Sequence, residues 1–184
     1  MATLTAPMTI EQFDQAGFPE NYELHGGVPV EMSVARAAHR IIQTQILHRF
    51  ERVFPDAWVQ FEMPFQIGVT NDERSADLGV TSLDRQQAAL AGNGMLKGAP
   101  EIVVEVLSPS NSALELKAYQ TLCFGHGTQI FLTVDPSENT VAVRRKGSRS
   151  EETWGKSEEF ILEIWGESHT FPVRDFFPNI PEKP

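Results

Sequence analysis

Hydrophobic and polar residues follow one another along this chain with two spacings, one typical of helices and one typical of strands. From residue 35 to residue 54 the positions that would share one helical face recur every three or four residues, which predicts an amphipathic helix. These positions are His39, Ile42, Ile46, Phe50 and Val53. Pro55 follows the segment directly and is expected to end the helix.

Strand-like segments follow this helix. Residues 58–63 alternate between two faces, a second strand is predicted at 65–69, and a polar turn at 70–75 leads into residues 77–81. Residues 102–107 are apolar except for Glu105 and are bounded by proline and serine, which predicts a buried strand. Later strands are predicted at residues 129–134, 140–145 and 160–165.

The remaining elements are predicted from turn and capping residues. Thr9 and Gln12 have the spacing of a capping box, which predicts a short helix there. Residues 22–24 and 28–32 flank two glycines and indicate a β-hairpin, with Pro29 favouring an edge strand. Residues 86–98 are expected to form a short helix and then a glycine-containing loop. A further helix is expected at about 113–124, with a last helical turn at 171–177. This order indicates a single α/β (α+β) domain over residues 1–184, with a central mixed sheet.

Charge and composition limit the classes of function that fit this chain. The 184 residues carry a net charge of −10, which disfavours strong non-specific binding to nucleic acid. A basic cluster at residues 144–149 is best explained as a solvated hairpin end. One cysteine excludes an intrachain disulfide, and neither a signal peptide nor a membrane span is evident, so we expect a cytoplasmic protein.

Two acids in apolar strands are the strongest candidates for chemistry. Glu105 lies within a buried run, where an ionised carboxylate needs a partner, and Asp77 begins another apolar strand. Two carboxylates on neighbouring strands suit a hard cation such as Mg²⁺ or Mn²⁺, which can activate water beside a phosphate. Lys117, on the helix after the Glu105 strand, is the lysine best placed to position that water. A structural ion pair with Arg74 or another basic residue is the alternative.

Several segments together resemble the bacterial putative restriction endonuclease family (Uma type) of the PD-(D/E)xK nuclease superfamily. The most specific of them is residues 100–110, Pro-Glu-Ile-Val-Val-Glu-Val-Leu-Ser-Pro-Ser. Weaker matches are residues 8–13, 22–32, His39, 74–80, 134–136 and 171–177, all in the family's order. The resemblance covers nearly the whole chain and implies a restriction-endonuclease-like core with an N-terminal β-hairpin.

The resemblance also implies roles for particular residues. Asp77 and Glu105 correspond to the metal-binding acids, with the backbone carbonyl of Val106 beside them. Glu23 corresponds to an additional acid on the first hairpin, and His39 to a histidine on the first long helix. The chain departs from the family where Ser75 and Ala76 replace Arg-Pro, with Arg74 displaced by one position.

A second departure concerns the family's lysine, whose expected position is occupied by Tyr119. Lys117 lies two residues earlier, and two residues rotate a helical side chain by roughly 200°. Tyr119 or Lys117 would then have to orient the water.

From these observations we expect a metal-dependent DNA endonuclease that uses Mg²⁺ or Mn²⁺ and acts as a homodimer. One alternative is a catalytically degenerate protein of the same fold that serves as a binding or assembly module. Another is a metal-dependent hydrolase of a small phosphorylated substrate.

Overall fold

The structure is a computed structural model that describes residues 7–32, 37–108 and 112–178. Its largest element is a nine-stranded sheet in the order β2-β1-β4-β6-β7-β8-β9, to which β3 and β5 are added through β4. The strands are β1 Tyr22–His25, β2 Val28–Glu31, β3 Ala57–Ile67, β4 Asp72–Ser82, β5 Leu96–Lys97, β6 Ile102–Val106, β7 Ile130–Asp135, β8 Thr140–Arg145 and β9 Glu151–Gly155. Strand pairs β6–β7 and β3–β5 are parallel and the others antiparallel, so the predicted mixed sheet is confirmed.

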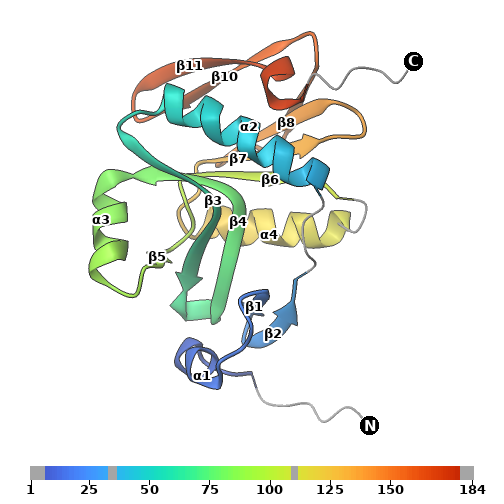
Figure 1. Cartoon of the computed structure of the whole chain (residues 1–184). Helices are drawn as coiled ribbons and strands as arrows, with labels where there is room; N and C mark the ends of the chain where they lie inside the picture. The colour runs from blue at the N-terminus through green and yellow to red at the C-terminus, as the bar shows by residue number, and fades with distance from the viewer. Residues whose placement is uncertain (1–6, 33–36, 109–111, 179–184) are drawn as a thin grey trace.

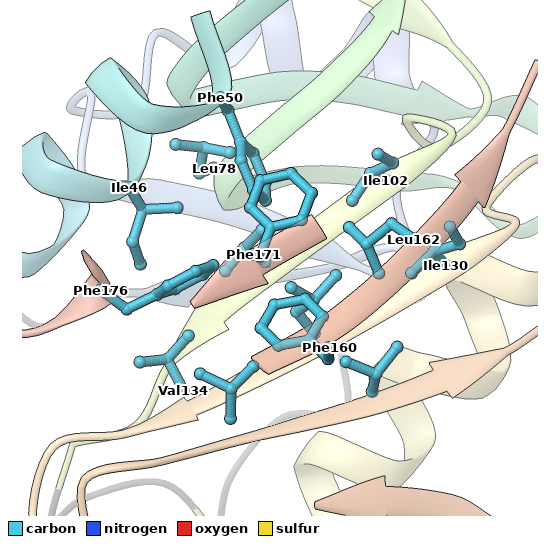
Figure 2. Packing of buried hydrophobic residues seen from close by; sticks show 14 of the residues in the cluster. Ile46, Phe50, Leu78, Ile102, Ile130, Val134, Phe160, Leu162, Phe171 and Phe176 are labelled. Carbon is cyan, nitrogen blue, oxygen red and sulfur yellow. The ribbon is translucent and has the colours of Figure 1, made fainter. Parts of the chain in front are cut away.

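Helix α2 and a separate hairpin cover one face of this sheet (Figure 1). The helix spans Ala37–Val53, and the hairpin pairs β10 (Glu159–Ile164) with β11 (Glu167–Pro172) before the 3-10 turn η2 (Val173–Phe176). Figure 2 shows the side chains that meet there, with Phe50 of α2 close to Phe171 and Phe176. The apolar face that the sequence predicts for this helix therefore packs into the main core.

The opposite face of the sheet is covered by α3 (Leu83–Ala91) and α4 (Ala113–Gly125), and α4 is seen below β6 in Figure 1. Here Phe65 and Phe131 of the sheet pack beside Tyr119 and Cys123 of α4. Helix α4 begins at the N-cap Ser112, whose hydroxyl accepts the Glu115 N–H. The short helix α1 (Ile10–Ala16) begins with the predicted capping box between Thr9 and Gln12.

The structure differs from the sequence prediction in several segments. The two strands expected at 58–69 are one long strand, β3, in which Glu62 adopts a positive φ of 47°. The polar turn expected at 70–75 is wrong beyond Asn71, since Asp72–Ser82 form one strand. Strands β5, β9 and β11 are not predicted by the sequence pattern. The last helical turn expected at 171–177 is the 3-10 turn η2.

A fork between strands as the candidate functional site

Strand β4 changes partner halfway along one of its edges. Its ladder with β6 pairs Leu78 with Val104, Gly79 with Val103 and Val80 with Ile102, and no described residue extends it. Toward its start, β4 pairs instead with β1, through Leu24 and Glu73. Residues 74–77 therefore face a fork between β1 and β6, while residues 74–76 are paired with β3 on the other edge.

Three carboxylates occupy this fork and bind backbone N–H groups that have no strand partner there. The N–H of Asp77 donates to Glu105 Oε1 at 3.2 Å, and the N–H of Val106 donates to Asp77 Oδ2 at 2.7 Å. The N–H of Ser75 donates to Glu23 Oε1 at 3.0 Å. Because backbone donors at a separated strand edge must find acceptors, these acids hold the fork in its shape. The structure thus brings together Glu23, Asp77 and Glu105.

Helix α2 fixes the orientation of the Asp77 carboxylate. His39 Nε2 lies 3.2 Å from Asp77 Oδ1, and Gln43 Nε2 donates to the same oxygen at 3.1 Å. Gln43 is only 2% exposed and also donates to the backbone carbonyl of Asp77 at 3.3 Å. The sequence pattern does not single out Gln43, although this residue lies four positions after His39 and so on the same helical face.

Charge in the fork is unbalanced around Glu105. Burial, which removes water from around the carboxyl, raises the pKa of Glu105 well above its usual value, and the negative charges of Asp77 and Glu23 raise this pKa further. The hydrogen bond from the Asp77 N–H and the charge of Arg74 lower the pKa, but they do not offset the increase. Glu105 nevertheless keeps a partly exposed side chain, so solvent reaches the fork.

Arg74 is the cationic side chain that acts on Glu105. Its Nε donates to Asp72 Oδ1 at 3.1 Å, and its Cζ lies 5.7 Å from the centre of the Tyr119 ring. Its Nη1 lies 2.8 Å from His25 Nε2 and 3.9 Å from Glu23 Oε2. His25 Nε2 is also 2.8 Å from Glu23 Oε2, so this nitrogen either accepts from Arg74 or donates to Glu23.

Tyr119 and Lys117 lie on different sides of α4. The Tyr119 hydroxyl donates to the Ser75 carbonyl at 3.1 Å, and its ring stacks on Phe65. Burial raises the pKa of the Tyr119 hydroxyl well above its usual value, so it stays protonated. Lys117 is exposed and has no acidic partner among the described residues. The structure therefore brings Tyr119, but not Lys117, to the fork.

The side-chain oxygens in the fork can be compared with the ligands that a metal ion requires. No group of three or more His, Cys, Asp or Glu side chains in the described ranges is arranged to hold a metal ion. The pair Asp77 and Glu105 does fit one hard cation, because Mg²⁺ commonly binds through one or two carboxylates. Asp77 Oδ2 and Glu105 Oε1 each accept one N–H, so both carboxylates keep acceptor capacity. A cation would also relieve the repulsion that raises the pKa of Glu105.

A mixed sheet flanked by helices, with acids where two strands separate, defines a restriction-endonuclease-like protein. The chain belongs to the Uma2 family, described as Putative restriction endonuclease, whose model matches residues 10–169. The fold is similar to the crystal structure of a putative nuclease belonging to DUF820 from Anabaena variabilis ATCC 29413. That similarity has a TM-score of 0.77 at 22% sequence identity, and it covers 93% of this chain and 98% of the other.

The comparison with curated proteins found no match. In the part of the chain that the structure describes, none of the helices is both long and apolar enough to cross a membrane.

Proposed function

We propose that this chain is a metal-dependent nuclease that hydrolyses phosphodiester bonds of DNA. The observation that carries the proposal is the pair of crossed hydrogen bonds between the Asp77 and Glu105 segments, at 3.2 and 2.7 Å. They hold two carboxylates together where β4 and β6 separate, in a place that solvent reaches. Membership in the family described as Putative restriction endonuclease supports the reaction class.

In this proposal Asp77 and Glu105 hold one divalent cation, Mg²⁺ or Mn²⁺, with the backbone carbonyl of Val106 as a third oxygen. When bound, such a cation lowers the pKa of a water and stabilises charge that develops on the phosphate. His39 and Gln43 keep the Asp77 carboxylate in one orientation. Glu23 adds negative charge at the β1 side of the fork.

Tyr119 has a positioning role in this scheme. Its hydroxyl is committed to the Ser75 carbonyl, which lies two residues before Asp77. Because its raised pKa keeps it protonated, Tyr119 cannot remove a proton from water at neutral pH. A general base would then have to come from a carboxylate or from the substrate phosphate. The proposal includes a homodimer, since cleavage of both strands of a duplex needs two such sites, and light scattering after size-exclusion chromatography measures the oligomeric state.

The test is a calorimetric titration with Mg²⁺ and Mn²⁺ of the native chain, Glu105→Ala and Glu138→Ala, followed by DNA cleavage with the same samples. Glu138 is an exposed acid in the turn after β7 and serves as the matched control. We expect metal binding and cleavage in the native chain and the control, and loss of both in Glu105→Ala. Native protein that binds neither metal would exclude the proposal.

A second candidate function is a catalytically degenerate nuclease fold that binds DNA or another partner without cleaving it. Two observations favour it: Tyr119 occupies the place of the family's lysine, and Lys117 is exposed on another side of α4. Metal binding without cleavage by the native chain would support this candidate. Cleavage that appears only in Tyr119→Lys would identify the missing lysine as the cause.

A further inference from the structure

We propose that Arg74 binds a phosphate oxygen of the substrate at the fork through its Nη2 group. This inference rests on the proposed function, because it assigns a residue that contacts the DNA backbone in the same site. Arg74 lies on β4, three residues before Asp77. Neither the family description nor the structural similarity assigns it a role.

The guanidinium of Arg74 is held on three sides by groups from three parts of the fold. Asp72 of β4 accepts from Nε at 3.1 Å, and His25 of β1 lies 2.8 Å from Nη1. The ring of Tyr119 from α4 lies under the guanidinium, with 5.7 Å between Cζ and the ring centre. The position of Tyr119 is in turn fixed by its hydrogen bond to the Ser75 carbonyl. A side chain held in this way loses little further conformational freedom when it binds a ligand.

One edge of this guanidinium remains available. Nη2 has no hydrogen-bond acceptor among the described residues. It is also not among the fully buried side-chain atoms without a partner, so Nη2 is not fully buried. The Arg74 side chain is 17% exposed. An arginine with a free N–H edge at the protein surface is suited to an anionic oxygen, and phosphate is the ligand for which this geometry is most used.

The charges around the fork explain why a phosphate needs this group. Glu23, Asp77 and Glu105 place three carboxylates there, and the chain as a whole carries a net charge of −10. Among the described residues, Arg74 is a basic side chain whose charge acts on Glu105, whereas Lys117 is exposed. A polyanion approaching these carboxylates therefore meets in Arg74 a positive group that its neighbours hold in place.

The test measures binding of a short fluorescein-labelled DNA duplex by anisotropy over a range of salt concentrations, with Ca²⁺ present to occupy the carboxylates. The variants are Arg74→Met, Arg74→Lys and the control Arg144→Met. Arg144 also lies 5.7 Å from an aromatic ring, that of Phe124, but it contacts Gln120 rather than the fork. A thermal unfolding experiment on each variant checks that the variant is folded at the assay temperature.

We expect Arg74→Met to weaken binding roughly tenfold at low salt and to reduce the salt-dependence slope by about one. Arg74→Lys keeps the charge, so it should keep the slope and lose only part of the affinity, while Arg144→Met should match the native chain. Equal slopes for the native chain and folded Arg74→Met would overturn the inference, as would absence of DNA binding by the native chain.

Cleavage with Mg²⁺ or Mn²⁺ on the same samples separates this inference from the proposed function. If the native chain cleaves DNA and Arg74→Met binds DNA as tightly as the native chain, the nuclease proposal stands and the role of Arg74 is excluded. If the native chain does not cleave DNA but its DNA binding depends on Arg74, the nuclease proposal is excluded and the phosphate contact of Arg74 stands.

Discussion

The backbone N–H of Asp77 donates to the carboxylate of Glu105, while the carboxylate of Asp77 accepts the N–H of the residue that follows Glu105. The two contacts, 3.2 and 2.7 Å long, replace the next rung of the β4–β6 ladder with side chains. Each acid is thus oriented by the backbone of the other strand. Burial of Glu105 in this arrangement raises the pKa of its carboxyl, and the nearby charge of Asp77 raises this pKa further.

A first prediction concerns the pH dependence of stability without metal. Because the folded pKa of Glu105 is raised, the folded state binds a proton more readily than the unfolded state does. This stabilisation is fully present below the usual value of 4.5 and is lost as pH rises through the folded pKa. Glu105→Gln keeps an oxygen that can accept the Asp77 N–H and removes the charge. We therefore expect the metal-free variant to match the native chain at low pH and to exceed its stability above the folded pKa.

The measurement is denaturant unfolding of both proteins in EDTA from pH 4 to pH 9, followed by the same series with Mg²⁺. Added Mg²⁺ should stabilise the native chain and have little effect on the variant, because a bound ligand stabilises only the state that binds it. Parallel pH profiles in EDTA would contradict the electrostatic account of the fork.

A second prediction tests the support that α2 gives to Asp77. Gln43→Leu removes the two hydrogen bonds from Gln43 Nε2 to Asp77, so the carboxylate is held less firmly. Groups that orient a metal ligand typically affect metal affinity about 10–100-fold, so we expect a loss of that size in calorimetric titration. Gln45→Leu is the control, since Gln45 lies on the same helix and has no hydrogen bond to the fork. Equal metal affinity in the two variants would show that Gln43 does not position Asp77.

A third prediction concerns the hairpin that carries Glu23. Gly26 and Gly27 both have positive φ, of 56° and 82°, so alanine is strained at either position. An alanine Cβ at Gly27 would also lie 2.7 Å from Pro7 Cβ and 2.9 Å from the Met8 carbonyl, whereas at Gly26 it would meet nothing within 4 Å. We expect Gly27→Ala to cost about 1–3 kcal/mol more than Gly26→Ala in denaturant unfolding. Costs that agree within error would mean that the contact with Pro7 and Met8 does not hold the hairpin.

A fourth prediction addresses the core that joins α2 to the β10–β11 hairpin. Phe50 is fully buried, and its ring lies 5.0 Å from that of Phe171 and 6.0 Å from that of Phe176. Phe50→Ala leaves a cavity between the helix and the hairpin and should lower the free energy of unfolding by about 3–5 kcal/mol. Val69→Ala, at a side chain that is 85% exposed, should change it by less than about 0.5 kcal/mol. A small effect of Phe50→Ala would indicate that the hairpin does not depend on this contact.

Local patterns were sufficient for the elements that carry their own signal. Helices α2 and α4 and the buried strand β6 were predicted to within a few residues, because periodicity, caps and apolar runs are properties of a short segment. The polar residues of Asp72–Ser75 concealed the first half of β4, since pairing with β3 and β1 decides their conformation. Strand β9 is rich in acids and lies at the sheet edge, where it forms by pairing with β8.

The sequence by itself determined the fold class, the main helix and the family. It singled out Asp77 and Glu105 from their place in apolar strands, and through the family it added Glu23 and His39 as candidates. It did so because these features depend on residue types at short or motif-defined spacings. Only the tertiary structure decided that Gln43 supports Asp77 and that Arg74 lies over Tyr119. These contacts join residues that are 34 and 45 positions apart in the sequence. These contacts form only where β4 stops pairing with β6 and pairs with β1 instead, so that β1 and β6 separate. That change of partner is a property of the assembled sheet and not of any single segment.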